Sequence, residues 1–333
     1  MPNLIENSMQ MRNQTWGSEW EMSNMTCSHC IKVVAKHYHT EHSIITGREY
    51  KRLHPELINF DLWQHEYGCL DSKGRMWWTH QDGSIRSYGE GVCELTTPIM
   101  TWDDIEDAQQ LLRELREKGA VSGERYGCGL HIHIGAFNTT DGSTNVQDAT
   151  SLRKLVNIMK SHEDLLIKAV NISASRYSRG GYANVISDEY VRRINRERPT
   201  TVSRVKQLYS CYGNPSSNGS RYTMLNYDSL DDNKTVEFRL FEFHNKMHAG
   251  ELKAYIHLCM AMCNYAKLVT RTSPQKVDMT NEKWAMKNWL NNMGLIGDEF
   301  KTTRKMLTKR LSGDMGRRTL ASNIDDLDLS VDG

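Results

Sequence analysis

Polar and apolar residues alternate with a period of two in three short stretches of the chain, at residues 17–22, 130–134 and 236–240. Successive side chains of a β-strand point to opposite faces, so each stretch is predicted to be a strand with one polar and one apolar face. Each polar face carries two ionisable side chains spaced two residues apart. These pairs are Glu19 and Glu21, His131 and His133, and Glu237 and Arg239.

Further strand and turn signals fill the first hundred residues. Residues 76–80 and 90–97 have the composition of strands, and the sequence Gln81-Asp82-Gly83-Ser84 between them is typical of a turn. Pro98 ends the second strand. We therefore expect residues 15–99 to consist of strands and turns.

Helical spacing of apolar residues begins after this region. It predicts helices over residues 105–118 and 148–170, a long helix over 249–269, and shorter ones at 281–292 and 298–311. The later part of the chain is therefore predicted to be rich in helices.

Two irregular segments lie between these helices. Residues 173–203 are rich in arginine around Gly180-Gly181, and we expect a loop, a short helix and another loop there. This segment has two interpretations, a solvated basic helix face or a lid that faces an anion. Residues 221–227 and 234–243 are predicted to form a β-hairpin through the turn-rich connector 228–233.

The composition is that of a soluble globular protein, with 333 residues, 38% hydrophobic and 25% charged. Lys and Arg number 42 against 41 Asp and Glu, so the net charge is +1 and no overall field attracts nucleic acid or anionic membranes. The N-terminus has no secretory pattern, and the best apolar stretch, residues 256–269, is too short to cross a bilayer. We expect a cytoplasmic protein that binds neither nucleic acid nor membranes.

The eight cysteines are spread along the chain, which favours reduced core residues over a disulfide framework. Cys27 and Cys30 form a CxxC motif. Together with His65 and Cys69 they would supply the four nitrogen or sulfur ligands of a structural zinc. The alternative is a pair of reduced, partly buried cysteines without metal.

Glu94, in a further predicted strand, adds a fourth segment with a potential metal ligand. Carboxylates crowded on one surface repel each other unless a cation lies among them, so the sequence predicts a metal site. The competing interpretation is an ordinary solvated strand face. Such faces usually carry Lys, Thr, Ser and Gln, however, and Gly127-Cys128-Gly129 before the histidine pair permits a close backbone approach.

These motifs occur in a characteristic order over residues 15–269. The order is Glu19 and Glu21, Asp82-Gly83-Ser84, Glu94, His131 and His133, Leu225-Asn226, and Glu237 with Arg239. This arrangement resembles the amidoligase family, carboxylate-amine ligases that share a fold and catalytic plan with glutamine synthetase and glutamate-cysteine ligase. Trp20 is bulkier than the aliphatic residue common between the two glutamates, but this departure removes no ligand.

The resemblance implies an α+β fold, with a curved, mainly antiparallel sheet whose concave face forms the active site and helices packed outside it. It implies an ATP-dependent ligase that joins a carboxylate to an amine through an acyl phosphate, using Mg²⁺ or Mn²⁺. By motif position, Glu21 and Glu94 would bind one cation. Glu19, His131 and Glu237 would bind the cation that bridges the ATP phosphates.

The resemblance also implies catalytic roles for two further residues. Arg239 would stabilise the transferring phosphoryl group, unless it forms an ion pair with Glu237 or Glu94 instead. His133 would accept a proton from the attacking ammonium, unless it is simply packed or hydrogen-bonded.

Basic residues that face the nucleotide or the substrate carboxylate are expected at Arg176, Arg179 and Arg221, with Arg179 the strongest candidate. The chain divides accordingly into an N-terminal extension (1–14), a catalytic domain (15–271), a C-terminal helical extension (272–312) and a flexible acidic tail (313–333). The candidate zinc-binding insertion spans about residues 25–72.

Two other functions fit parts of this pattern. A metal-dependent hydrolase could use His131 and His133 with carboxylates and needs no nucleotide, but barrel hydrolases of this type require many alternating βα units, which the chain lacks. A non-catalytic zinc-binding module centred on the CxxC motif is the other alternative. The identity of the carboxylate and of the amine is not indicated by the sequence.

Overall fold

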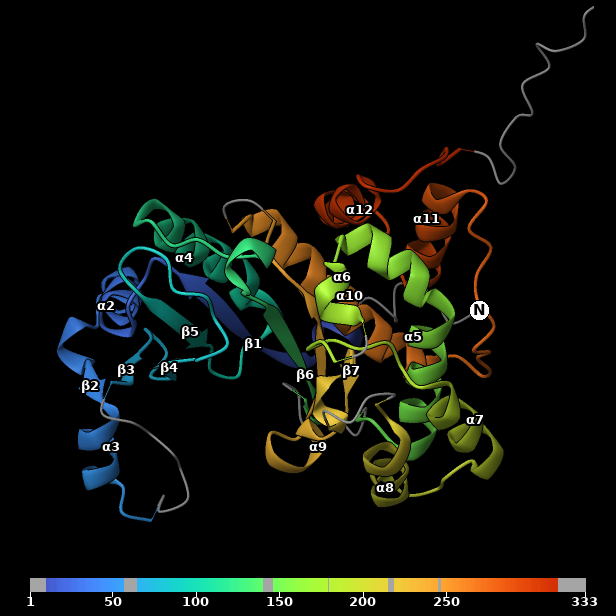
Figure 1. Ribbon diagram of the computed structural model, residues 1–333, viewed down its shortest axis with the longest axis horizontal. Coiled ribbons are helices and arrows are strands. Elements are labelled where there is room, and N and C mark those ends of the chain that lie inside the picture. The colour runs from blue at the N-terminus through green and yellow to red at the C-terminus, as the bar shows by residue number, and fades with distance from the viewer. Residues whose placement is uncertain are drawn as a thin grey trace, which may run out of the picture.

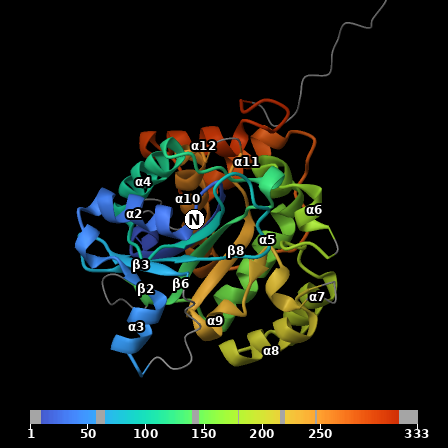
Figure 2. The same cartoon turned by 60° about the vertical axis from the view of Figure 1, so that its left-hand side comes forward.

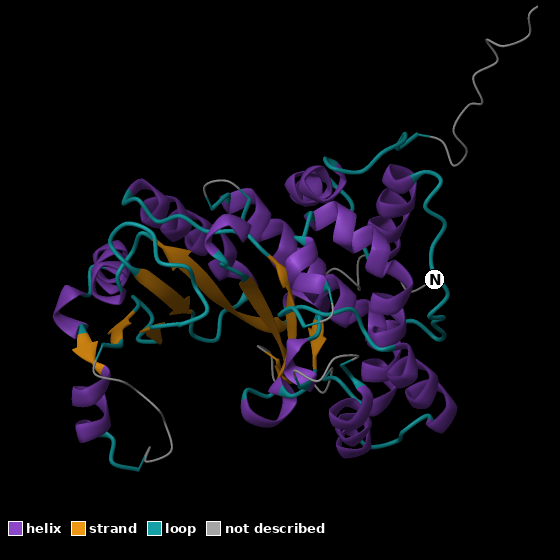
Figure 3. Ribbon diagram, viewed as in Figure 1, coloured by secondary structure: helices purple, strands orange, loops and turns teal. Residues whose placement is uncertain are grey.

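Eight strands of the described chain form a single sheet in which all neighbours are antiparallel. The computed structural model describes residues 10–56, 65–139, 146–178, 180–214, 219–244 and 247–316. The strands are β1 (Gln14–Ser23), β2 (Ile45–Thr46), β3 (Tyr67–Leu70), β4 (Met76–His80), β5 (Val92–Thr96), β6 (Leu130–Thr139), β7 (Leu225–Asn226) and β8 (Thr235–Phe241). Their order is β2-β3-β4-β5-β1-β6-β8-β7, and Figure 3 shows the twist of the sheet.

Helices surround the sheet, and some of them cover one of its faces. The described helices are α2 (Cys27–Tyr38), α3 (Gly47–Leu53), α4 (Ile105–Glu117), α5 (Ala149–Val170), α6 (Ala174–Tyr177), α7 (Asp188–Glu197), α8 (Val202–Tyr212), α9 (Ser229–Asp232), α10 (Ala249–Leu268), α11 (Glu282–Asn292) and α12 (Lys301–Thr308). Helix α2 packs on β3, β4 and β5, and α10 packs on β1 and β6. In both Figure 1 and Figure 2, α2, α4 and α10 lie on the same side of the sheet, while α5, α7 and α8 gather at its β7 and β8 end.

Strand β1 is central and shows why one face is apolar and the other polar. Its residues Ser18, Trp20 and Met22 are at most 2% exposed and belong to the face under the helices. The intervening Glu19 and Glu21 therefore point to the other face. The antiparallel register places Glu19 opposite His131 and Glu21 opposite Glu94.

The C-terminal helices are joined to this core by buried polar contacts. Glu251 of α10, only 2% exposed in its side chain, accepts hydrogen bonds from Lys309 and Arg310, each at 2.9 Å. His257 of α10 contacts the Thr303 hydroxyl of α12 at 2.8 Å. No described helix combines the length with the apolar character needed to cross a membrane.

Most of the predicted elements are present, including all three alternating strands and the helices α4, α5, α10 and α11. The hairpin is confirmed as β7 paired with β8, with the short helix α9 in its connector.

The expectation of strands and turns throughout residues 15–99 was wrong, because this region contains the helices α2 and α3. The longer one is α2. That helix begins where the Thr26 hydroxyl accepts from the His29 amide, and it buries Ile31 and Val34 against the sheet. Within the arginine-rich segment there are two helices, α6 and α7, and α8 begins before the segment ends. The acidic tail beyond residue 316 lies outside the described residues.

Candidate active site

The polar face of the sheet is the floor of a cleft of about 530 Å³. This volume lies within the range of roughly 300–1,000 Å³ that small-molecule sites occupy. The floor residues are Glu19, Glu21, Glu94, His131, His133, Glu237 and Arg239. Several of them are buried, and Glu21, His131, His133 and Glu237 are each at most 7% exposed. The alternative of a solvated strand face is therefore wrong for this surface.

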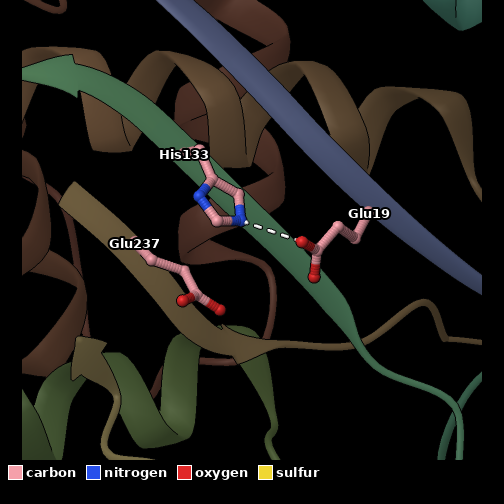
Figure 4. Close-up of side chains that lie close together, drawn as sticks. All are labelled: Glu19, His133 and Glu237. Atoms are coloured by element: carbon pink, nitrogen blue, oxygen red, sulfur yellow. Dashed lines mark ion pairs between the residues drawn. The ribbon is translucent and has the colours of Figure 1, made fainter. Parts of the chain in front are cut away.

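One group of potential ligands comes from three neighbouring strands. Glu19 on β1, His133 on β6 and Glu237 on β8 each bring one ligand atom to within 4.8 Å of the other two. Figure 4 shows their side chains directed toward one another. The His133 Nε2 atom lies 3.3 Å from Glu19 Oε1, and Nδ1 lies 3.0 Å from the Thr235 hydroxyl.

His131 also lies close to these carboxylates. Its Nδ1 atom is 2.8 Å from Glu19 Oε2 and 3.7 Å from Glu237, and its Nε2 atom is 3.5 Å from Glu21 Oε1. The assignment of His131 to a cation shared with Glu19 and Glu237 therefore stays a prediction. The register places His131 opposite Glu19 and His133 opposite Glu237, so both imidazoles reach this pair of carboxylates.

A second group consists of carboxylates alone. Glu21, Asp82 and Glu94 bring their oxygens to within 4.8 Å of one another. Burial and then the negative charges of Glu19, Glu21 and Asp82 hold the pKa of Glu94 well above its usual value. The Gly129 amide donates to Glu21 Oε2 at 2.5 Å, which fixes one side of the group. Three acids held this close form the kind of site that accepts a cation.

Arg239 lies next to the first group. Its Nη1 atom is 2.5 Å from Glu237 Oε1, and its Nε donates to the Tyr182 carbonyl at 3.4 Å. The ion pair with Glu237 that the sequence left open is thus present. Burial alone would raise the pKa of Glu237, but the positive charges of Arg239 and His133 outweigh it and lower the pKa. Glu237 is therefore held as a carboxylate.

The other predicted arginines have different positions. Arg176 is 6% exposed and lines the cleft, and its guanidinium lies so close to Gly129 that a Cβ there would be 2.5 Å from Nη2. Its Nε is buried without a hydrogen-bond partner in the described part of the chain. Arg221 is exposed and also lines the cleft. Arg179 lies outside the described residues.

A second cavity of about 510 Å³ opens onto the same face. It shares Glu19, Glu94 and His133 with the cleft, so the two spaces meet at the potential metal ligands. Its remaining walls include Trp16, Thr97, Pro98, Ile99 and Lys234. The Ile99 side chain is 63% exposed and adds an apolar surface to this cavity.

Comparison with known proteins shows which family the chain belongs to. A family model described as "Putative amidoligase enzyme" matches residues 12–263. The chain belongs to this amidoligase family. No curated protein matches the sequence.

Among solved structures, this member of the amidoligase family is similar to a bifunctional glutathione synthetase from Pasteurella multocida, with 11% identity and a TM-score of 0.40. The match covers 92% of this chain and 48% of that one, so the chain spans about half the length of this neighbour. A likeness this weak carries no argument about mechanism.

The cysteines of this amidoligase family member lie apart from the cleft floor. Cys27 and Cys30 are in the first turns of α2 and Cys69 is on β3, and all three are buried, whereas His65 is exposed. In the described ranges, the groups of three or more potential metal ligands are the two on the cleft floor, and neither contains these cysteines or His65. All eight cysteines are free. The structural zinc stays a prediction.

Several cleft residues were not assigned from the sequence. Asp82 was noted only as part of a turn motif, although its place between two strands of the sheet was a usable signal. Asn226 donates to Glu237 Oε2 at 2.6 Å and was noted only within Leu225-Asn226. Tyr182 and Tyr222 line the cleft from irregular segments, and no periodic pattern marks them.

Proposed function

We propose that this protein is an ATP-dependent carboxylate-amine ligase that forms an amide bond through an acyl phosphate and uses divalent cations. One observation carries the proposal: two adjacent groups of potential ligands and a buried guanidinium converge on the floor of one cleft. Hydrolysis of a simple ester or amide does not require such a guanidinium, whereas phosphoryl transfer does benefit from one. The proposal includes a glutamine synthetase-like catalytic plan for the domain at residues 15–271.

The donor atoms fit hard divalent cations. Carboxylate oxygens are the ligands that Mg²⁺ and Mn²⁺ prefer, and the second group consists of three carboxylates. Burial and then the repulsion between these acids and Glu19 raise the pKa of Glu94. In the first group, the His133 Nε2 atom is buried and has no hydrogen-bond partner of good geometry among the described residues. We assign Glu19, His133 and Glu237 to one cation. Glu21, Asp82 and Glu94 are assigned to a second.

The basic residues of the cleft fit the phosphates of a nucleotide. Bound cations would neutralise charge on the phosphate oxygens. Arg239 is held in place by Glu237 and the Tyr182 carbonyl before any substrate arrives, so its donors need little reorganisation to meet a phosphoryl group. Arg176 and Arg221 line the same cleft and extend its positive charge.

The second cavity suits the carboxylate substrate. The arginines Arg176, Arg221 and Arg239 all line the first cleft and not the second cavity, so the nucleotide is expected in the first. A carboxylate that enters through the second cavity reaches the shared residues Glu19 and His133 without displacing the nucleotide. Its body would then contact the apolar wall that includes Ile99.

The geometry favours His133 as a ligand rather than as a proton acceptor. Nε2 is the atom that faces Glu19, and Nδ1 is engaged with the Thr235 hydroxyl. An imidazole that binds a cation through Nε2 cannot accept a proton at that atom. The two roles assigned to this histidine are therefore exclusive.

The decisive experiment is a screen for ADP release over pairs of carboxylates and amines in the presence of Mg²⁺, with mass spectrometry of the product. ADP is expected only when both partners are present. Glu237→Gln and Arg239→Ala are each expected to reduce turnover by at least roughly 10²-fold, the usual effect of removing one preorganised charge-stabilising group.

The matched controls are Glu106→Gln and Arg192→Ala, whose side chains are 84% and 74% exposed and lie outside the cleft. Both should keep full activity. Turnover that survives both cleft substitutions contradicts the proposal. Cleavage of a substrate without consumption of nucleotide would instead support the hydrolase alternative.

A further inference from the structure

Two tyrosines form a fixed pair at the margin of the cleft. Tyr182 lies in the segment between α6 and α7, two residues before Asn184, and Tyr222 lies in the short 3-10 helix Ser220–Tyr222. Their ring centroids are 5.6 Å apart with an interplanar angle of 76°, an edge-to-face arrangement. Both rings line the cleft, and Tyr182 is 49% exposed. The fold therefore presents a large aromatic surface to the space above the proposed phosphate site.

The backbone ties these two segments together. Asn184 is fully buried, and its side-chain amide donates to the carbonyls of Gly181 at 2.5 Å and Tyr222 at 2.8 Å. The Asn184 amide donates to the same Tyr222 carbonyl at 2.8 Å, and the Met224 amide donates to the Asn184 carbonyl at 2.8 Å. Tyr182 is therefore exposed on a segment whose position is set by buried hydrogen bonds.

Guanidinium groups flank the tyrosine pair on the side of the cleft floor. The Arg221 Cζ atom lies 4.9 Å from the centroid of the Tyr222 ring, and the Arg239 Cζ atom lies 5.8 Å from it. The Tyr182 carbonyl accepts from Arg239 Nε. An aromatic surface thus adjoins positive charge within one cleft. A nucleotide has the matching arrangement, with a flat base joined through a sugar to its phosphates.

We propose that Tyr182 stacks against the base of the bound nucleotide, with Tyr222 supporting it edge-on and Arg221 meeting the phosphates. This inference rests on the proposed function, because it assumes that a nucleotide occupies the cleft. Stacking on an aromatic ring tolerates different bases, so Tyr182 acts on affinity for the nucleoside part and not on the choice between bases.

The test compares ATP with inorganic tripolyphosphate, which carries the same phosphates without a base. Calorimetric titration of the full chain in Mg²⁺ measures both dissociation constants. Tyr182→Ala is expected to weaken ATP and GTP binding by roughly tenfold, the scale of one lost base stack, and to leave tripolyphosphate binding unchanged. Tyr182→Trp should keep wild-type affinity for ATP. Arg221→Ala should weaken ATP and tripolyphosphate together.

Tyr88→Ala is the matched control, because Tyr88 is 52% exposed and does not line the cleft. It should leave both constants unchanged. Unchanged ATP affinity in Tyr182→Ala, or an equal loss for tripolyphosphate, overturns the stacking role while the proposed function stands. A wild-type protein that binds neither ligand overturns the proposed function itself.

Discussion

Glu94 is a carboxylate whose charge fits its surroundings poorly. It is half-buried beside Glu19, Glu21 and Asp82, and desolvation together with those negative charges raises its pKa well above the usual value. An acid whose pKa is raised in the folded state costs stability once the pH exceeds its unfolded value, so at pH 7 this glutamate destabilises the protein in the absence of a cation. A bound cation reverses that cost because it binds the folded state alone.

Glu94→Gln is therefore expected to raise the melting temperature in EDTA by a few degrees and to lose the stabilisation that Mn²⁺ gives the wild type. Thermal unfolding followed by fluorescence, with and without Mn²⁺, measures both effects. The exposed Glu106→Gln serves as control and should behave as the wild type. A lower melting temperature in EDTA, or an undiminished response to Mn²⁺, would contradict this account of the site.

At this scale the sequence predicts which residues share a face but not which atoms meet. A period of two was sufficient to place Glu19, Glu21 and Glu237 on the cleft floor. It could not decide between His131 and His133, because both occupy that face and the choice depends on the register with β1 and β8. Tyr182 lies in an irregular segment whose position depends on contacts distant in sequence.

Among the elements, Glu251 joins α10 to the segment after α12, because it accepts hydrogen bonds from Lys309 and Arg310. Burial would raise the pKa of this carboxylate, but hydrogen bonds from His244 and Lys309 outweigh it and lower the pKa to about 2. A carboxylate whose pKa is lower in the folded state than in the unfolded state contributes stability above its unfolded pKa, here near 4.5. That stability is lost as the pH falls toward about 2.

Glu251→Gln should lower the free energy of unfolding at pH 7 by about 2 kcal/mol, because Lys309 and Arg310 lose their buried partner. Urea unfolding of both proteins from pH 7 to pH 2.5 measures the difference, which should shrink once the pH falls below about 4.5. Glu299→Gln removes an exposed ion pair with Arg12 and should change stability by less than about 1 kcal/mol. A difference that is constant over the whole pH range would exclude the charge as its cause.

Elements with a long, regular pattern were the ones that sequence could predict. Helices α4 and α5 have a clear apolar stripe, and the Asp148 side chain caps α5, so their predicted bounds were close to those observed. Helix α2 was missed because its CxxC motif suggested a metal loop, although Thr26 at its N-cap and the apolar run Ile31, Val33, Val34 were usable signals. The sequence therefore did favour a helix there, but the CxxC motif led to a different prediction.

For the whole molecule, the half-buried His162 and the buried His257 make the free energy of unfolding fall as the pH becomes mildly acidic. Burial lowers the pKa of His162 to about 4 and that of His257 to about 3. His162 stacks on Trp289 of α11, and His257 of α10 stacks on Trp102, which lies just before α4. Each stacked pair therefore joins two segments that are distant in sequence. In the unfolded chain both would take up a proton near pH 6.5, and stability is therefore present above that pH and lost as the pH falls toward 4.

The free energy of unfolding is accordingly expected to decline between pH 6.5 and pH 4, by up to about 1.4 kcal/mol per pH unit for each histidine, and the melting temperature should fall with it. His162→Asn and His257→Asn should each make the decline shallower in a series of thermal unfolding curves. Exposed His39→Asn is the control and should not alter the slope. If the decline with pH is equally steep in His162→Asn, in His257→Asn and in the wild type, groups other than these histidines cause it.

The two cavities have a consequence for how substrates influence each other. Glu19, Glu94 and His133 belong to the walls of both, so a ligand that reorients these side chains in one cavity changes the binding free energy in the other. Such a coupling is reciprocal by thermodynamic necessity. If one substrate increases the affinity for the second by about tenfold, the second increases the affinity for the first by the same factor. With a positive coupling of this kind, the complex with both substrates is more populated than independent binding allows.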